Sequence, residues 1–186
     1  DDPILIIGAG MGGMAAALAL QNFGFRVAIY EDAPELGEVG AGLTVPPNAT
    51  YALEFLGLGE KLEALADIPD SAAVRHYQTG EVLVVRERAE RSLEAYGAQY
   101  YQIHRADLHK ILVDAVLDND PDCLHLNHSF ESLTQSTNSV RAHFANGAEA
   151  KGTTLIGCDG LRSTVRANLF TEKEPRFTGY VAWRGL

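Results

Sequence analysis

The chain has 186 residues, a length that suits one domain or one domain with the beginning of a second. Hydrophobic residues make up 46% of it and charged residues 22%, close to the averages of soluble globular proteins, so disorder is disfavoured. The formal net charge is -10 and no run of lysine or arginine is present, which disfavours nucleic-acid binding. No apolar stretch approaches the roughly 20 residues of a membrane span, and no signal peptide is recognisable, so we expect a cytoplasmic protein without membrane contact.

Cysteines and histidines do not form a ligand pattern. Cys123 and Cys158 lie far apart without CxxC spacing, and we expect both to be reduced and partly buried. The six histidines are scattered, and His104 and His109 stand five apart, the wrong separation for one helix face. No metal site is therefore predicted, because chelation needs convergent ligands.

The first thirty residues have the pattern of a β-α-β unit. Ile4–Ile7 is a continuous β-prone run, typical of a parallel strand that is buried on both faces. Residues 14–22 are rich in helix formers, and residues 26–30 are predicted as a second strand. Residues 33–48, rich in glycine and proline, are predicted to form a long structured loop rather than a regular element.

The remaining predicted elements follow from periodicity and turn signals. They are, in chain order, helices over 49–56 and 59–66, a hairpin over 74–77 and 82–86, an amphipathic helix over 106–118, strands over 124–127, 140–144, 148–151 and 154–157, and a helix over 164–169. Asn146 and Gly147 are predicted to form a tight hairpin turn, and Ser163 to cap the last helix.

A glycine-rich turn, GAGMGG at residues 8–13, joins the first strand to the first helix. Gly8 permits the tight turn, Gly10 lets the main chain approach a pyrophosphate, and Gly13 lets the helix pack closely on the strand. With Met11, these residues form a helix start whose free N–H groups and positive dipole end suit phosphates. An ordinary tight βα turn is the alternative interpretation.

An acidic pair, Glu31 and Asp32, follows the second strand about 20 residues after the turn, as in dinucleotide-binding folds. Glu31 can accept hydrogen bonds from both ribose hydroxyls of an adenosine. Because a carboxylate repels a ribose phosphate, this site favours FAD or NAD over NADP. A solvated acid at a strand end is the alternative interpretation.

Residues 157–166 (GCDGLRSTVR) resemble the DG motif of the para-hydroxybenzoate hydroxylase superfamily of single-component flavoprotein monooxygenases. Residues 35–43 (ELGEVGAGL), 47–49 (PNA) and 104–108 (HRADL) match the same group, and look most similar to its salicylate hydroxylase and 3-hydroxybenzoate 6-hydroxylase branch. Residues 177–184 (FTGYVAWR) are similar to the strand that enters the substrate domain of those enzymes.

The resemblance implies an α/β fold. Residues 1–172 would form a Rossmann-like FAD-binding domain with a parallel sheet and an antiparallel meander, in which a hairpin insertion over residues 72–102 contributes to the substrate side. Residues 173–186 would begin a substrate-domain strand. Family members run to roughly twice this length and carry a further block that grips the cofactor. The chain is therefore expected to be truncated, to bind FAD weakly and to hydroxylate nothing alone.

The resemblance also assigns residues to the cofactor. The ADP half of FAD would be held by Gly8, Gly10, Met11, Gly13, Glu31 and Asp32, and the main chain of Phe130 would touch adenine. Ala41 and Gly42 would pass near the flavin. Arg105 would approach the pyrophosphate and ribityl region, and Asp159 with Gly160 would bind the ribityl chain. Arg162 and Arg166 would assist NADH or NADPH. Plainer alternatives are an Arg105 that neutralises Asp107 or caps a helix, a simple turn at residues 159–160, and solvated arginines.

The implied activity is FAD-dependent hydroxylation of a phenolic or benzoate-like aromatic substrate, with NADH or NADPH as transient reductant and O2 as oxidant. The resemblance assigns no catalytic residue in this chain, and Arg184 is a candidate for a positive patch that attracts an anionic substrate. Two alternatives stay open: another FAD-dependent oxidoreductase of the superfamily, such as an epoxidase, halogenase or reductase, and a truncated FAD-binding module without activity. A homo-oligomer is also left open.

Overall fold

The computed structural model describes residues 2–37, 41–170 and 175–181, and the chain divides into two compact units. Unit 1 contains the described residues up to 37 and from 112 onward, and unit 2 contains residues 41–111. The boundary falls inside helix α5 (Arg105–Asn119).

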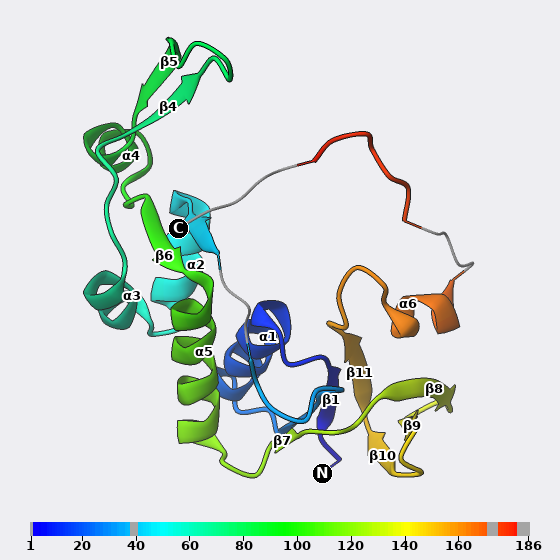
Figure 1. Ribbon diagram of the computed structural model, residues 1–186. Helices are drawn as coiled ribbons and strands as arrows, with labels where there is room; N and C mark the ends of the chain where they lie inside the picture. The colour runs from blue at the N-terminus through cyan, green and yellow to red at the C-terminus, as the bar shows by residue number, and fades with distance from the viewer. Residues whose placement is uncertain (1, 38–40, 171–174, 182–186) are drawn as a thin grey trace. The chain divides into compact units, whose positions relative to one another are not determined.

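Unit 1 combines a parallel and an antiparallel sheet (Figure 1). Its elements are β1 (Ile4–Ile7), α1 (Met11–Asn22), β2 (Val27–Tyr30), β7 (Leu124–His125), β8 (Phe130–Gln135), β9 (Val140–Phe144), β10 (Glu149–Gly152), β11 (Thr154–Gly157) and α6 (Thr164–Leu169). The parallel sheet has the strand order β11-β1-β2-β7, and the antiparallel sheet has the order β10-β9-β8. This is the mixed α/β architecture that the sequence predicts.

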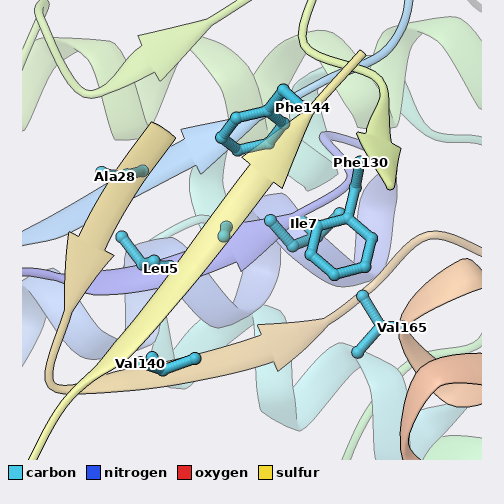
Figure 2. Close-up of a cluster of buried hydrophobic side chains, with 9 residues drawn as sticks. Leu5, Ile7, Ala28, Phe130, Val140, Phe144 and Val165 are labelled. Carbon is cyan, nitrogen blue, oxygen red and sulfur yellow. The ribbon is translucent and has the colours of Figure 1, made fainter. Parts of the chain in front are cut away.

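The core of unit 1 lies on both faces of the parallel sheet. On one face, Leu5, Ile7 and Ala28 belong to a buried cluster with antiparallel-sheet residues such as Phe144 (Figure 2). On the other face, α1 packs against β1 and β2. Because side chains alternate along a strand, the buried Ile29 of β2 points to this face. Burial of each large aliphatic side chain contributes about 1.5–3 kcal/mol, which explains why these strands are continuous apolar runs.

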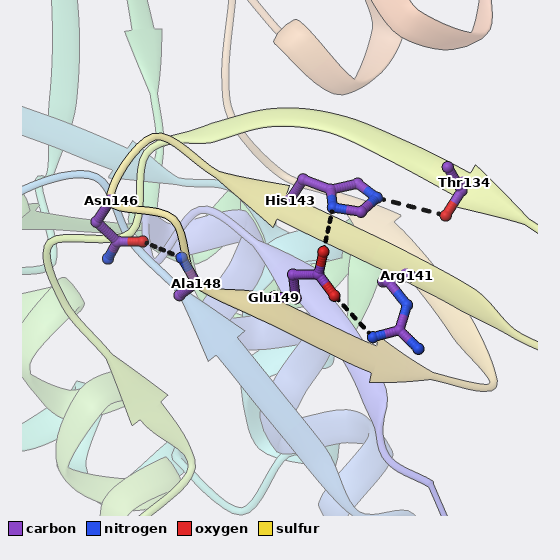
Figure 3. A network of polar contacts seen from close by, with 6 residues as sticks. All are labelled: Thr134, Arg141, His143, Asn146, Ala148 and Glu149. Atoms are coloured by element: carbon purple, nitrogen blue, oxygen red, sulfur yellow. Dashed lines mark hydrogen bonds and ion pairs between the residues drawn. The ribbon is translucent and has the colours of Figure 1, made fainter.

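The outer face of the antiparallel sheet is polar (Figure 3). Glu149 accepts a hydrogen bond from Arg141 at 2.8 Å and contacts the Nδ1 atom of His143 at 3.2 Å. The Nε2 atom of His143 lies 3.4 Å from the hydroxyl of Thr134. Exposed pairs of this kind contribute about 0–1 kcal/mol, so we assign this network a minor role in stability.

Unit 2 contains two small antiparallel sheets and several helices. Its elements are β3 (Gly42–Val45), α2 (Pro47–Phe55), α3 (Gly59–Leu65), β4 (Ser71–Arg75), β5 (Val82–Glu87), α4 (Ala89–Tyr96), β6 (Tyr101–His104) and the first part of α5. Strand β3 pairs with β6, and β4 pairs with β5 as an isolated hairpin. Residues 82–85 of β5 are a run of four aliphatic side chains, and all four are exposed.

Several predicted elements are confirmed. The structure contains both strands of the β-α-β unit, the amphipathic helix α5, the hairpin turn at Asn146 and Gly147, and helix α6 with Ser163 at its N-cap. Both cysteines are free, with Cys123 buried and Cys158 partly buried. Among the described residues, no helix combines the length and apolar character that a membrane span requires.

Other predictions are wrong. Residues 33–48 are not all loop, because Gly42–Val45 forms strand β3, and helix α2 already begins at Pro47. Strand β7 ends at His125 rather than at residue 127. Of the strand predicted over 177–184, residues 177–181 belong to no helix or strand, and residues 182–184 lie outside the described part of the chain.

Gly13 provides the first testable prediction. A Cβ atom at Gly13 would lie 1.9 Å from the carbonyl oxygen of Gly8, whereas one at Gly12, also in the first turn of α1, would meet no atom within 4 Å. We therefore expect Gly13→Ala to lower stability by at least about 2 kcal/mol. Gly12→Ala is the matched control and should be neutral or stabilising by up to about 1 kcal/mol. Thermal unfolding followed by circular dichroism measures both changes, and equal midpoints for the two variants would contradict this packing.

Cys123 provides a prediction about pH. Burial, assisted by the negative charge of Asp120, raises the pKa of the Cys123 thiol to about 11. The unfolded chain ionises this thiol from about pH 9, so deprotonation favours unfolding between about pH 9 and pH 11, at a cost of roughly 1–3 kcal/mol. We expect the unfolding midpoint in urea to fall across this window, and to fall less in Cys123→Ala. If the urea midpoint of the variant fell with pH as steeply as that of the unchanged chain, the loss of stability would belong to other groups, such as Tyr30. Burial raises the pKa of Tyr30 as well.

Candidate functional site

A cavity of about 390 Å³ opens in unit 1 at the carboxyl ends of the parallel strands. Ile7 of β1 stands opposite Gly157 of β11 and Tyr30 of β2, and Tyr30 stands opposite His125 of β7. This register brings the residues that follow each strand to one edge of the sheet, the usual ligand position in open α/β sheets. The cavity is lined by Ile7, Gly8, Gly10, Tyr30, Glu31, Asp32, His128, Ser129, Phe130, Cys158, Asp159, Gly160, Arg162 and Thr164.

The glycines of the turn have different roles. Gly8 has a φ of +101°, and a Cβ atom there would lie 2.5 Å from the carbonyl oxygen of Cys158, so only glycine fits. Gly13 faces the carbonyl of Gly8, which allows α1 to begin directly beside the end of β1. A Cβ atom at Gly10 would meet nothing within 4 Å, and Gly10 lines the cavity. The bare surface that the sequence predicts for a phosphate is therefore at Gly10.

The amino end of α1 offers free hydrogen-bond donors. Gly10 is the N-cap, no side chain caps the helix, and its first turn holds no acidic residue. Met14 is the residue whose N–H bonds to the carbonyl of Gly10, at 3.0 Å, so the amides of Met11, Gly12 and Gly13 have no acceptor inside the helix. With the positive end of the helix dipole, these amides suit an anion such as a phosphate.

Glu31 is fixed by the main chain on both of its carboxylate oxygens. Its Oε2 atom accepts a hydrogen bond of 2.7 Å from the N–H of Ala9, and its Oε1 atom accepts one of 3.0 Å from the N–H of Ala33. Each oxygen keeps further lone pairs for a ligand. Because Ala9 lies in the glycine-rich turn, the acid and the helix start are held together as one structure. Glu31 therefore lines the cavity beside the start of α1.

Aromatic rings pack around Tyr30, which lines the cavity and precedes Glu31 in the chain. Tyr30 stacks on His125 at 4.8 Å and on Phe144 at 4.7 Å between ring centroids. The ring of His128 meets Tyr30 edge-on at 5.4 Å and Phe144 at 5.1 Å. Burial, assisted by the neighbouring His128, lowers the pKa of His125, which favours the neutral ring in this stack.

Asp159 connects the cavity to helix α6. Its Oδ1 atom accepts a hydrogen bond of 2.5 Å from the hydroxyl of Ser163, and its Oδ2 atom accepts one of 3.0 Å from the N–H of Val165. The carboxylate thus holds the start of α6 while it also lines the cavity. Burial and the charge of Asp159 raise the pKa of the Cys158 thiol, so this cysteine is a weak nucleophile at neutral pH.

The structure brings seven of the predicted site residues together around the cavity. They are Gly8, Gly10, Glu31, Asp32, Phe130, Asp159 and Gly160. Met11 and Gly13 belong to the adjoining first turn of α1 and do not line the cavity.

Three predicted residues lie in unit 2, where they are close to one another. The N–H of Arg105 donates a hydrogen bond of 3.3 Å to the carbonyl of Ala41, and Gly42 pairs with His104 across β3 and β6. A Cβ atom at Gly42 would meet nothing within 4 Å. Arg184 lies outside the described residues.

Sequence reasoning did not assign Tyr30, His128, Ser129, Cys158 or Thr164 to the site, and it considered Arg162 only for the nicotinamide. The available signal was positional for two of the six, because Tyr30 ends β2 and Cys158 directly follows β11. The strand β7 is predicted from the sequence, whereas the loop that follows it, residues 126–129, carries no recognisable ligand-binding motif. Among the described residues, no cluster of histidine, cysteine, aspartate or glutamate could hold a metal ion.

Comparison with known proteins identifies relatives of the whole described chain. Residues 1–183 match the family described as FAD binding domain. The chain is 36% identical to 6-hydroxynicotinate 3-monooxygenase of Pseudomonas fluorescens over 184 residues, which is 98% of this chain and 47% of the relative. It is also 36% identical to 3-hydroxybenzoate 6-hydroxylase of Polaromonas naphthalenivorans, over 100% of this chain and 46% of the relative. The chain thus spans about half the length of the curated relatives it matches.

Solved structures share the fold. HpxO of Klebsiella pneumoniae in complex with FAD and uric acid superimposes with a TM-score of 0.78 at 27% identity, over 88% of this chain and 41% of that one. The 2,6-dihydroxypyridine-3-hydroxylase of Arthrobacter nicotinovorans superimposes with a TM-score of 0.78 at 26% identity, over 96% of this chain and 42% of that one.

Proposed function

Because this chain belongs to the FAD binding domain family, we propose that the cavity of unit 1 binds the ADP part of FAD. One observation carries the proposal: an uncapped helix start and a carboxylate fixed by the main chain, Glu31, adjoin the same cavity. The first suits a diphosphate and the second suits the two ribose hydroxyls. The volume of about 390 Å³ is within the range of small-molecule sites.

Each part of the ligand has a proposed contact. The amides at the start of α1 hold the phosphates beside Gly10, Glu31 accepts hydrogen bonds from the ribose hydroxyls with Asp32 beside it, and the main chain of Phe130 contacts adenine. Asp159 and Gly160 lead toward the ribityl chain. Ala41, Gly42 and Arg105 of unit 2 are proposed to serve the flavin, the pyrophosphate and the ribityl chain.

For the whole protein we propose FAD-dependent hydroxylation of a phenolic or benzoate-like aromatic substrate, with NADH or NADPH and O2. The names of the curated relatives, which include a hydroxybenzoate hydroxylase and a hydroxynicotinate monooxygenase, support this proposal. Bound FAD supplies the electron transfer from the nicotinamide and the activation of O2. The residues of this chain bind and orient the cofactor, and Cys158, with its raised pKa, is not expected to act as a nucleophile.

The division of the chain is part of the same proposal. Residues 1–172 act as the FAD-binding domain, the hairpin region over residues 72–102 contributes to the substrate side, and residues 173–186 begin the substrate domain. Two free cysteines support a cytoplasmic location. Association of copies into a homo-oligomer is compatible with the proposal and is not required by it.

Glu31→Ala tests the nucleotide site directly. We expect titration calorimetry of the 186-residue chain to show binding of ADP and FAD, and weaker binding of FMN, which lacks the ADP part. Loss of the charged acceptor should weaken ADP binding about 10- to 100-fold, as for hydrogen bonds of about 1.5–3 kcal/mol to a charged group. A 2′-phosphorylated ADP should bind poorly to the unchanged chain.

Glu149→Ala is the matched control for this experiment. Glu149 is also an acid with two hydrogen-bonded oxygens, yet it lies on the outer face of the antiparallel sheet and does not line the cavity. Its loss should leave ADP affinity unchanged. Unfolding midpoints identify any variant that fails to fold. Equal ADP affinity in Glu31→Ala and the unchanged chain would remove Glu31 from the site.

The full-length protein tests the proposed activity. When it is loaded with FAD, we expect NADH or NADPH oxidation to accelerate with hydroxybenzoates or hydroxypyridine carboxylates, and a hydroxylated product to form with uptake of labelled O2. Acceleration without a hydroxylated product across the panel would contradict the monooxygenase assignment while leaving the FAD site in place.

A further inference from the structure

The loop that joins β7 to β8, residues 126–129, forms the cavity wall beside Glu31. The N–H of His128 donates a hydrogen bond of 2.8 Å to the carbonyl of Glu31, and the N–H of Asn127 donates one of 3.1 Å to the carbonyl of Ala33. The side-chain amide of Asn146 donates to the carbonyl of Asn127 at 2.9 Å. Asn127 adopts a positive φ of 57°, which turns the chain at this point. The loop is therefore held firmly against the acid proposed to bind the ribose.

The hydrogen bonds of His128 determine which of its ring nitrogens carries the proton. Its Nδ1 atom lies 2.7 Å from the carbonyl oxygen of Leu126. A carbonyl only accepts, so Nδ1 must donate, and in the neutral ring Nε2 is left as an acceptor. Within the described part of the chain, Nε2 of His128 has no hydrogen-bond partner. A flip of the ring would break the bond to Leu126, so the acceptor is fixed in place.

Two aromatic contacts hold the plane of this imidazole. Tyr30 and Phe144 each meet the ring edge-on, with interplanar angles of 62° and 86°. His128 lines the same cavity as Glu31. A purine joined to a ribose on Glu31 would lie along this wall, beside the one acceptor that the neutral imidazole keeps.

We propose that His128 determines base specificity, with its Nε2 atom accepting a hydrogen bond from the 6-amino group of adenine. This inference rests on the proposed function of the cavity and adds the selection of the base. Adenine carries a donor at position 6, whereas guanine carries an acceptor oxygen there. A 6-oxo purine would place its oxygen against the lone pair of Nε2, and two acceptors that face each other cannot form a hydrogen bond. The site therefore selects adenine nucleotides over 6-oxo purine nucleotides.

Calorimetric titration of ADP and of inosine 5′-diphosphate into the 186-residue chain tests the proposal. Inosine 5′-diphosphate keeps the ribose and both phosphates and carries a 6-oxo base. The unchanged chain should bind ADP about tenfold more tightly. His128→Leu should weaken ADP binding about 3- to 10-fold and change inosine 5′-diphosphate binding little, because one neutral hydrogen bond contributes about 0.5–1.5 kcal/mol. The preference for ADP should thus disappear.

A second variant and a control separate recognition from folding. His128→Gln presents either an oxygen or an amino group, so it should bind both nucleotides with similar affinity. His143→Leu removes a histidine that contacts Thr134 and Glu149 outside the cavity, and it should leave the preference intact. Long-range 15N NMR should show His128 protonated at Nδ1, with a shift of the Nε2 signal on addition of ADP.

The outcomes distinguish this inference from the proposed function. If the unchanged chain binds neither nucleotide, the proposed ADP site fails and the inference fails with it. If it binds both equally, or if His128→Leu and His128→Gln weaken both equally, the ADP site stands and base selection by His128 is overturned. Protonation of His128 at Nε2 would also overturn it.

Discussion

The close approach of two main-chain segments, Gly13 against the carbonyl of Gly8, is the constraint on which the site depends. It leaves no room for a Cβ atom and allows α1 to start with only three residues between it and the end of β1. As a result the free amides of the first helical turn lie at the edge of the parallel sheet, where the neighbouring strands also end. A wider connection would move these amides away from Glu31, and the diphosphate and ribose positions would no longer adjoin.

The electrostatics of the cavity follow from how its acids are bonded. Glu31, Asp32 and Asp159 are three carboxylates in a site proposed to take an anion. Glu31 is bound by two main-chain amides and Asp159 by the start of α6, so neither carboxylate points unpaired at the helix start. The positive end of α1, with Arg162 among the lining residues, supplies the opposite charge. The site thus divides into a donor-rich part, proposed for phosphate, and an acceptor-rich part, proposed for the sugar and base.

The sequence predicts the local parts of this arrangement well, because each depends on neighbours in the chain. The buried run Ile4–Ile7, the glycine spacing and the capping serine at residue 163 all act within a few residues. The missed strands β3 and β8 have no clear local signal. Strand β3 contains Gly42 and precedes two prolines, and it is a strand only because Tyr101–His104 pairs with it. Strand β8 lacks a regular alternation of polar and apolar residues, because its pairing with β9 is interrupted by a bulge between Phe130 and Ser132.

The candidate site shows the same contrast between features that depend on neighbouring residues and features that depend on the fold. Glu31 could be predicted from its spacing to the turn, whereas His128 could not, because its role depends on a carbonyl, two rings and a loop conformation that form only in the fold. The expectation of a strand over residues 177–184 came from resemblance to other proteins and not from a local signal, and its described part, residues 177–181, belongs to no helix or strand.

The hairpin β4–β5 has a consequence for handling the chain. Residues 82–85 read VLVV, carry no charge or proline, and expose their side chains on a two-stranded ribbon. Open edges and uncovered aliphatic surface of this kind promote strand-to-strand association between molecules, so solutions of this chain should be most monodisperse when dilute. Two charged residues flank the run, since Glu81 precedes it and Arg86 follows it. In a parallel stack of copies in register, each Glu81 would face another Glu81 and each Arg86 another Arg86, and this repulsion limits such stacking.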